Sequence, residues 1–488
     1  MYMLEFRSHL DRLESEGLLH RVAKPVDPEW EIASMTRWMY HGFDEADRFG
    51  LLFENVEGYD WPVTTAAIGA SRQVYARALD VEVGDIHSRW ETALENFRRP
   101  TPVSDAPVKA NVATGARATL ADVPSLVWTP RKDAGPYLTT VVVTKNRETG
   151  VQNLAIYRCQ MVDDGTLALN IKTGRHGFRD FRSYADADEP APVAIVVGAA
   201  PAVHLSSITN VDYEEDELEL AGGLLGEPLE TTEAETVDLD VPASAELVIE
   251  GTIDPTERMR EGPFGEFAGY MGHAFEKPVV DVTAICRRDD PIFYSSMGQM
   301  PPSEDHVIQS ISNAALYRKR LADDEGHPTV SDVSIDETYS GILGHAIVRM
   351  DPRYPEEGAE VGTELANISQ LKRVTVVNED VDVRDPLHVA WAVNARVDPK
   401  RDVTILEDVF LNPAKDPAVE TEPRDQSKSS KLVVDATVES IPVDEMPDVS
   451  IPPRADMNAA LESWSETDLP ELDPKRRMEL LLDHHPGE

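Results

Sequence analysis

A series of strand-like segments in the middle of the chain constrains the fold most strongly. Each is rich in β-branched and aromatic residues, and they occupy residues 137–145, 152–162, 166–172, 193–198, 245–251 and 279–287. Glu148-Thr149-Gly150 and Asp163-Asp164-Gly165 separate the first three, and such short glycine-containing turns join antiparallel strands. The sequence therefore predicts a β-rich central domain, built as a sheet or a barrel.

The segment before this domain is predicted to be mixed α/β. Phe6, Leu10 and Leu13 recur at helical spacing, and Gly17 is suited to end that helix. Asp27-Pro28 offers a helix N-cap followed by a first-turn proline, which predicts a second helix from this point. Core packing accounts for these positions without any catalytic role.

The segment after the central domain is predicted to form an α/β domain. Residues 303–322 have a helical pattern, and residues 372–377 resemble a buried strand. A helix from Asp385-Pro386 and a strand at 402–406 follow, which together with 372–377 suggest a β-α-β unit.

The length of 488 residues exceeds what one hydrophobic core supports. Prolines are frequent between Arg98 and Arg131, which places a boundary near residue 110. The expected fold class is α/β (α+β). The expected divisions are an N-terminal α/β domain at 1–110, the β-rich domain at 111–302, the C-terminal α/β domain at 303–445 and an acidic tail or arm at 446–488.

The formal net charge of −43, from 89 acidic and 46 basic residues, limits the partners of this protein. Such a field repels nucleic acids and anionic membrane surfaces. The charge has two interpretations: an acidic interaction surface, or halophilic adaptation, in which carboxylates keep the protein hydrated in a salty cytoplasm. The spread of acidic residues along the whole chain favours the second interpretation.

The N-terminal residues, the apolar runs and the number of cysteines further limit the expected location and chemistry of the protein. The N-terminal residues lack a secretory signal, and no apolar run approaches the roughly 20 residues of a membrane span, so a cytoplasmic protein is expected. Cys159 and Cys286 are the two cysteines, which excludes a disulfide framework and a thiolate-rich metal site. Patterns for Walker A, GxGxxG, HExxH and GxSxG enzymes are absent.

The segment from Glu261 to Glu266, with the sequence EGPFGE, is a candidate catalytic loop. Two carboxylates flank a bend of two glycines and a proline, and such a pair allows one group to stay ionised while the other delivers a proton. The alternative is that both are solvated loop charges in a very acidic protein.

A second candidate is Arg158, within an otherwise apolar strand. A lone buried guanidinium is costly, so Arg158 needs a carboxylate or phosphate partner, in an active site or in an ordinary salt bridge. Strand alternation places Asn153 and Tyr157 on the face opposite Arg158. Asn153, His176 and Glu217 together would suit a divalent metal with mixed nitrogen and oxygen ligands, such as Mn²⁺ or Mg²⁺, although a solvated His176 and Glu217 are equally ordinary.

The order of these motifs resembles that of the UbiD-type decarboxylases, which use prenylated FMN. The matching segments are Asn153…Arg158, Arg175-His176, Ser206-Ser207, Glu217, 261–266 with Gly269-Tyr270, 298–305, Lys372, 380–382 and 430–437. They cover most of the chain. The 430–435 segment departs from the usual version, which contains methionine and glycine.

The resemblance implies a central split β-barrel that holds the flavin and a C-terminal α/β domain that contributes to a homo-oligomer. It also implies three sets of site residues: a catalytic network of Arg158, Glu261 and Glu266, with Glu266 as proton donor; cofactor contacts from Ile156, Tyr157, Arg158, Arg175, His176, Ser206, Ser207 and Lys372; and metal ligands Asn153, His176 and Glu217. Arg175 and His176 could exchange roles, and Glu219 could replace Glu217.

The implied activity is reversible, non-oxidative decarboxylation of an aromatic or α,β-unsaturated carboxylic acid. The implied cofactors are prenylated FMN, Mn²⁺ or Mg²⁺, and K⁺, with a flavin prenyltransferase as supplier. Two alternatives remain: a hydrolase that uses Glu261 and Glu266 as acid and base, and a flavin- or metal-binding protein, or acidic scaffold, without catalysis.

Overall fold

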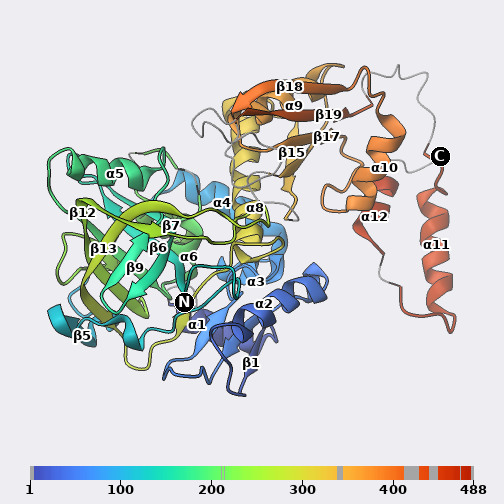
Figure 1. The fold of residues 1–488 in the computed structure, drawn as a ribbon. Coiled ribbons are helices and arrows are strands. Elements are labelled where there is room, and N and C mark those ends of the chain that lie inside the picture. Colours follow the sequence, from blue (N-terminus) through green and yellow to red (C-terminus); the bar gives the residue numbers. More distant parts are fainter. Residues whose placement is uncertain are drawn as a thin grey trace. The chain divides into compact units, whose positions relative to one another are not determined.

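The computed structural model describes residues 5–209, 211–213, 215–337, 344–410, 428–438, 449–472 and 474–484. These form two compact units (Figure 1). Met1–Asn313 makes up most of the first, whereas Ala314–Asp336 and most of the chain from Ile342 onward make up the second. Within the described residues, no helix is both long and apolar enough to cross a membrane.

The first unit begins with a small α/β segment. Its four-stranded sheet has the order β1-β2-β3-β14, formed by Leu19–Val22, Gly50–Phe53, Val63–Thr65 and Phe293–Tyr294. Its helices are α1 (Phe6–Ser15), α2 (Glu31–Gly42), α3 (Arg72–Ala78) and α4 (Ile86–Glu95). Strand β14 follows the central domain in sequence and pairs parallel with β3. Segments from before and after the central domain therefore contribute to the same sheet.

The first predicted helix is confirmed, and the start of the second is wrong. Phe6, Leu10 and Leu13 are buried, and Gly17 takes a positive φ of 75° just after α1. Helix α2 begins at Glu31 rather than at Pro28. The Asp27 carboxylate instead accepts the N–H of Glu29 at 2.7 Å, which closes a local turn before the helix.

Six antiparallel strands in the first unit close into a barrel. Their order is β12-β9-β6-β7-β8-β13, and β13 pairs back onto β12, while the short β5 adds to the outer side of β13. The strands are β5 (Asn111–Thr114), β6 (Tyr137–Lys145), β7 (Gln152–Asp163), β8 (Thr166–Leu169), β9 (Ala191–Val197), β12 (Leu247–Glu261) and β13 (Phe275–Arg287). The predicted β-rich domain is therefore a closed barrel and not an open sheet.

The hairpin between β6 and β7 shows how local sequence sets the register of the barrel. The Asn146 side chain accepts the N–H groups of Glu148 and Thr149 at 2.8 and 2.9 Å, and Gly150 follows with φ of 72°. The pairing of β6 with β7 then runs without a bulge along both strands. Unbroken alternation keeps Asn153 and Arg158 on opposite faces of β7, as predicted.

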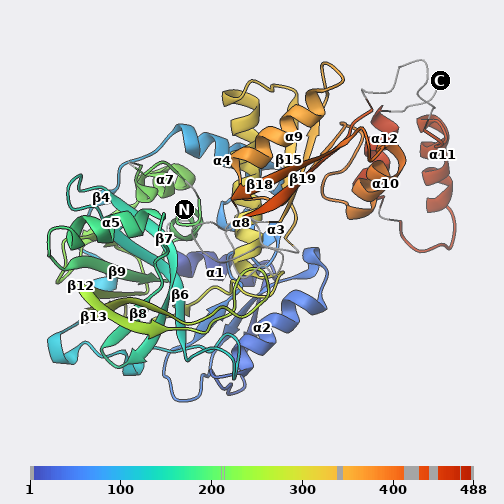
Figure 2. The same ribbon diagram turned by 45° about the horizontal axis from the view of Figure 1, so that its top comes forward.

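Shorter elements surround the barrel. Helix α5 (His176–Ala185) contacts β6, β7, β9 and β12 (Figure 2). Helix α7 (Glu217–Leu225) packs on α4 and on α6 (Pro201–Ser206). A three-stranded sheet has the order β11-β10-β4, from Asp240–Pro242, Glu230–Glu233 and Thr101–Pro102.

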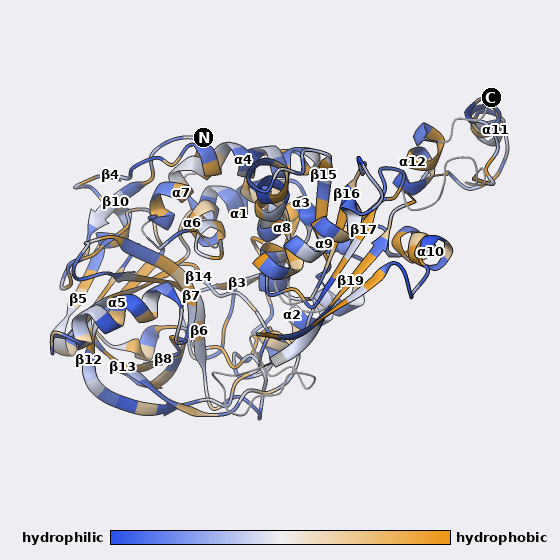
Figure 3. Cartoon of the chain, turned by 90° about the horizontal axis from the view of Figure 1, so that it is seen from above, coloured by the Kyte–Doolittle hydropathy of each residue, from blue (hydrophilic) through white to orange (hydrophobic). Residues whose placement is uncertain are grey.

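The second unit is an α/β domain with a five-stranded sheet in the order β15-β16-β17-β19-β18. Hydrophobic residues of β17 and β19 are prominent in Figure 3, and Val374, Val376 and Val433 pack in one core with residues of α9. The elements are α8 (Glu304–Lys319, which starts in the first unit), β15 (Val330–Ile335), β16 (His345–Met350), α9 (Glu357–Ile368), β17 (Arg373–Val377), α10 (Pro386–Arg396), β18 (Val403–Phe410), β19 (Lys428–Ala436), α11 (Arg454–Ser465) and α12 (Arg476–His484).

The predicted β-α-β unit in this domain is wrong, although its elements exist. Strand β19 lies between β17 and β18, and β18 runs antiparallel to β19. The parallel β-α-β unit is instead β16-α9-β17. Strand β18 occupies the edge of the sheet and pairs with β19, a placement that the periodicity of single segments does not reveal. The boundaries near residues 110 and 445 remain predictions.

Candidate active site

Arg158 and the two glutamates of the EGPFGE segment meet in a buried cluster. Arg158 Nε lies 2.8 Å from Glu261 Oε1, and Nη2 lies 3.1 Å from Glu261 Oε2, a two-point contact. Arg158 Nη1 lies 3.0 Å from Glu266 Oε1. Glu261 is fully buried and Glu266 is 8% exposed. Arg158 thus has the carboxylate partners that its place in an apolar strand requires.

The fold brings these residues together from two separate parts of the barrel. Arg158 lies on β7, Glu261 is the last residue of β12, and Glu266 lies in the loop between β12 and β13. Phe264 from the same loop lies under Arg158, with the guanidinium carbon 4.8 Å from the ring centroid. The loop therefore places a carboxylate and an aromatic ring around one guanidinium.

Charges in the cluster favour ionised side chains. Burial alone would raise the pKa of Glu266, but the positive charges of Lys172, 3.6 Å away, and Arg158 outweigh burial and hold that pKa below its usual range. Burial would lower the pKa of Arg158, and the carboxylates of Glu266 and Glu261 reverse this effect and raise it. Glu266 is therefore a carboxylate at neutral pH, with a half-exposed ammonium group beside it.

Glu217 lies against the backbone of β7 next to Asn153. The Leu154 N–H donates to Glu217 Oε2 at 2.8 Å, so the carboxylate adjoins the backbone next to Asn153. Both side chains are buried, at 5% and 3% exposure. Burial raises the pKa of Glu217 to about 8. A cation at this carboxylate would offset the cost of its burial.

His176 approaches the same region through a chain of polar contacts. Asn153 Nδ2 donates to Thr144 Oγ1 at 3.1 Å, and Thr144 donates to Asp180 at 2.6 Å. Tyr213 donates to the second oxygen of Asp180 at 2.9 Å, and the rings of His176 and Tyr213 lie 5.1 Å apart. Burial, together with the nearby charges of Arg179 and Arg175, lowers the pKa of His176. Its ring is therefore neutral and able to act as a ligand.

The two residue pairs whose roles the sequence left open differ in their surroundings. Arg175 is exposed at the start of α5, whereas His176 is half-buried. Glu217 is buried beside β7, whereas Glu219 is partly exposed and lies 3.6 Å from Arg99. These surroundings favour His176 and Glu217 as the metal ligands.

The remaining predicted cofactor residues occupy three places. Ile156 and Tyr157 are on β7, and the Tyr157 hydroxyl accepts the Gly177 N–H at 3.2 Å. The Ser206 and Ser207 hydroxyls donate to the carbonyls of Val203 and His204 around helix α6. Lys372 belongs to the second unit, where it directly precedes β17.

Lys172 and Phe264 contact the cluster but were absent from the sequence prediction. Phe264 lies within the EGPFGE segment, so a search for ring partners of Arg158 could have found it. Lys172 follows the short strand β8, and its distance from Glu266 depends on the pairing of β8 with β13, for which local sequence carries no signal.

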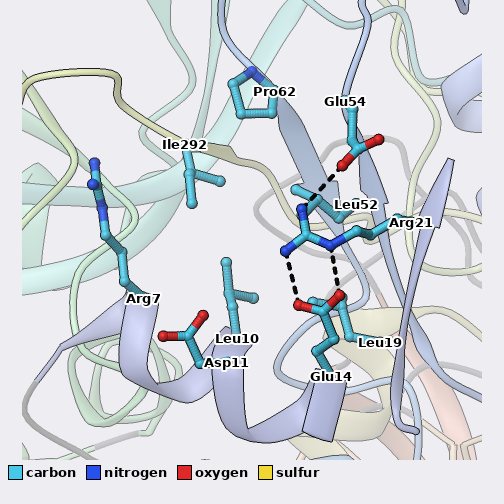
Figure 4. Close-up of a pocket in the computed structure, with 10 residues that line it drawn as sticks. All are labelled: Arg7, Leu10, Asp11, Glu14, Leu19, Arg21, Leu52, Glu54, Pro62 and Ile292. Carbon is cyan, nitrogen blue, oxygen red and sulfur yellow. Dashed lines mark hydrogen bonds and ion pairs between the residues drawn. The ribbon is translucent and has the colours of Figure 1, made fainter. Parts of the chain in front are cut away.

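Two surface pockets lie away from these residues. One, of about 320 Å³, opens between α1 and the strands of the N-terminal sheet (Figure 4). There Arg21 is held between Glu14 and Glu54, at 2.6 and 3.0 Å, over an apolar floor of leucines. The other follows α9 and is lined largely by glutamates. Neither pocket includes a residue of the predicted site.

Comparison with known families decides the class of protein. Models of the N-terminal, Rift-related and C-terminal domains of 3-octaprenyl-4-hydroxybenzoate carboxy-lyase match residues 10–94, 101–301 and 306–436. The chain belongs to the UbiD family. It is an enzyme of the carboxy-lyase type, and its mixed α/β fold with a closed central barrel matches UbiD-class structures. The family resemblance and the enzyme class inferred from the sequence are confirmed.

Individual UbiD relatives cover nearly the full chain. An uncharacterized protein of Archaeoglobus fulgidus is 32% identical over 462 residues, which cover 89% of this chain and 91% of the relative. An evolved dimeric form of the UbiD-class enzyme HmfF from Pelotomaculum thermopropionicum, in complex with prFMN, is 34% identical with a TM-score of 0.81, covering 92% and 97% of the two chains. Vanillic acid decarboxylase from Sedimentibacter hydroxybenzoicus is 28% identical, with a TM-score of 0.82 and coverage of 95% and 99%.

Proposed function

We propose that this UbiD-family enzyme is a prenylated-FMN-dependent, reversible decarboxylase of an aromatic or α,β-unsaturated carboxylic acid. The observation that carries the proposal is the buried contact of Arg158 with both Glu261 and Glu266 beside the barrel. A solved relative that binds prFMN and another that decarboxylates vanillic acid support the cofactor and the substrate class. We further propose a homo-oligomer, a cytoplasmic and halophilic setting, and a flavin prenyltransferase as cofactor supplier.

The residues around β7 fit a flavin phosphate held through a divalent cation. Asn153, His176 and Glu217 offer an amide, a neutral imidazole and a buried carboxylate, a donor set suited to Mn²⁺ or Mg²⁺. The raised pKa of Glu217 indicates a carboxylate that gains from a nearby cation. Cofactor contacts would come from Ile156, Tyr157, Arg158, Arg175, His176, Ser206, Ser207 and Lys372. We also propose K⁺ as a second ion.

When bound, prenylated FMN supplies the electron sink for the electron pair left by departing carbon dioxide. The protein must orient the substrate and return a proton to the same carbon. Arg158 can attract the substrate carboxylate, since a guanidinium binds such groups at two points. Glu266 delivers the proton, and Glu261, at the end of β12, holds the Arg158 guanidinium in position.

Glu266 must acquire a proton before it can deliver one, because its pKa is held low in the structure. Lys172 lies 3.6 Å from Glu266, and its side chain is 44% exposed. Its positive charge stabilises the carboxylate form, so Glu266 gains a proton only when the attraction from its cationic neighbours weakens. Approach of an anionic substrate to Arg158 weakens the attraction between Arg158 and Glu266, which favours protonation of Glu266.

Glu266→Gln tests the assignment of the proton donor. The amide keeps a similar shape and cannot donate a titratable proton, so we expect turnover to fall by about 10²–10⁴-fold. The enzyme should be produced with a flavin prenyltransferase, and carbon dioxide release measured over a panel of unsaturated and aromatic acids. Flavin absorbance of the variant should match that of the wild type. Wild-type turnover in Glu266→Gln would exclude Glu266 as donor.

The same measurements separate the alternatives. A hydrolase that uses Glu261 and Glu266 would cleave its substrate without any flavin spectrum. The contact of both carboxylates with Arg158 argues against it, because an acid and base pair of glutamates needs no guanidinium and leaves Arg158 without a role. A binding protein or scaffold would take up flavin or metal but would release carbon dioxide from none of the acids in the panel.

A further inference from the structure

The backbone N–H and carbonyl groups of Glu266 both form hydrogen bonds within the loop that contains Glu266. Its N–H donates to the Tyr270 carbonyl at 2.8 Å, and its carbonyl accepts the Gly269 N–H at 2.9 Å. This turn fixes the shape of residues 266–270. It does not fix where the turn lies relative to Arg158, which is on another strand. Contacts from outside the loop must supply that position.

Two side chains from outside the loop hold the residues on either side of Glu266. Asp133, which precedes β6, accepts the Gly265 N–H on Oδ1 at 3.2 Å. His306, in the first turn of α8, has Nε2 3.0 Å from the Phe267 carbonyl oxygen. The rings of His306 and Phe267 also meet edge to face, with centroids 5.0 Å apart. One residue before and one residue after Glu266 are therefore anchored.

The Asp133 anchor is itself fixed. Asp133 Oδ2 accepts the Thr129 N–H at 2.6 Å, and Gln299 Nε2 lies 3.4 Å from the same oxygen. Gln299 in turn contacts Arg37 and Thr129. A Cβ atom on Gly265 would lie 2.6 Å from the Gln299 side chain, so the glycine allows the loop to reach this support.

The His306 anchor has a defined ring. A carbonyl can only accept, so Nε2 must carry the hydrogen, and Nδ1 accepts the Ser303 hydroxyl at 2.5 Å. Burial lowers the pKa of His306 to about 4, so the ring is neutral at physiological pH. The hydrogen on Nε2 is therefore directed at the Phe267 carbonyl.

We propose that Asp133 and His306 are positioning residues, which together hold Glu266 where its carboxyl group reaches the reacting carbon. The inference rests on the role proposed above for Glu266. Misplacement of a reacting group by about 1 Å can cost about 10²-fold in rate. Loss of either anchor should therefore lower kcat while KM and flavin affinity stay close to wild type, because neither side chain contacts Arg158.

The test uses His306→Leu and Asp133→Ala in the flavin-loaded enzyme. We expect kcat to fall 10- to 100-fold in each, and exchange of the product proton with D₂O to slow in parallel. His306→Gln keeps an N–H near the Nε2 position and should restore most of kcat. His9→Leu and Glu250→Ala are matched controls: His9 is also buried with Nε2 2.7 Å from a carbonyl, and Glu250 accepts two backbone N–H groups away from the loop.

A kcat equal to wild type, or a fall no larger than in the controls, would overturn the proposal. Hydrogen exchange of the Gly265 amide gives a second readout that needs no turnover. It should rise in Asp133→Ala and remain protected in Glu250→Ala, and unchanged protection would also overturn the proposal. If the wild type released carbon dioxide from no acid, the proposed function would fail while this exchange still reported on the anchor.

Discussion

At the scale of single residues, Arg158 is the group on which the buried cluster with Glu261 and Glu266 depends. Arg158→Ala would remove the ion-pair partner of buried Glu261 and leave Glu266 with the half-exposed Lys172 as its counter-charge. Breaking a buried ion pair by removing one partner costs about 3–5 kcal/mol, and we expect unfolding free energy to fall by that amount. Denaturant titration measures it. Arg158→Lys should recover only part of the loss, because one ammonium group cannot make the two-point contact with Glu261.

The pKa of Glu266 determines how the stability loss in Arg158→Ala changes with pH. The pKa of Glu266 lies below its unfolded value, so its contribution to stability is present above the unfolded pKa and is lost as pH falls through the folded pKa. Without Arg158, one of the two positive charges that oppose burial is gone and the pKa of Glu266 rises, so the variant should lose stability relative to wild type as pH rises through the weakly acidic range. A constant difference between the two proteins at every pH would contradict this account.

Asp305 gives a second, independent pH effect. Its Oδ1 is buried without a hydrogen-bond partner in the described structure, and burial raises its pKa to about 6. The folded state keeps a proton that the unfolded state loses, so stability should fall as pH rises from about 4 to about 6, by up to about 3 kcal/mol. Asp305→Asn should remove this slope in unfolding titrations across that range. If Asp305→Asn kept the wild-type slope, groups other than Asp305 would cause the fall of stability with pH.

Sequence reasoning found residues with an unusual local setting and missed those defined by distant contacts. Arg158 stood out because a charge in an apolar strand needs a partner, and Glu261 and Glu266 because they flank a tight bend. Asp133 and His306 have no such signal. Each is an ordinary polar residue near a turn or a helix start, and only tertiary packing brings it to the loop of Glu266.

At the scale of elements, barrel closure depends on the pairing of β12 with β13. Gly251 lies at a register shift in this pairing, and a Cβ there would lie 2.6 Å from the Asp281 carbonyl oxygen, a backbone atom. We expect Gly251→Ala to lower unfolding free energy by about 1–3 kcal/mol. Gly84→Ala is the control, because nothing lies within 4 Å of its added methyl group. Equal stability of both variants would show that the closed barrel tolerates a methyl group at Gly251.

Sequence patterns predicted the elements better than their arrangement. Strand β6 was predicted with its observed limits, because Pro136 precedes it and a hairpin turn follows it. Strand β12 extends ten residues beyond the predicted end at residue 251, through Glu261. Its later part is polar and partly exposed, so alternation of apolar residues ends before the strand does. The placement of β18 beside β19 likewise depends on long-range pairing.

At the scale of the whole molecule, the net charge of −43 sets the conditions for stability. Repulsion among exposed carboxylates acts over about 10 Å at 0.1 M salt and about 3 Å at 1 M. We expect the thermal unfolding midpoint to rise steadily with KCl over this range. Sorbitol at equal osmolality is the control and should have a smaller effect. A midpoint that is independent of KCl would contradict the halophilic interpretation of the composition.

The sequence separation of 103 positions between Arg158 and Glu261 has a consequence for synthesis of the protein. Strand β7 leaves the ribosome long before β12, and the barrel cannot close until β13, which ends at Arg287, has also emerged. During that interval Arg158 is exposed on an unfinished sheet whose edge strands lack partners, a state prone to association with other chains. Assembly of the cluster of Arg158, Glu261 and Glu266 and protection of those edges are therefore completed by the same event.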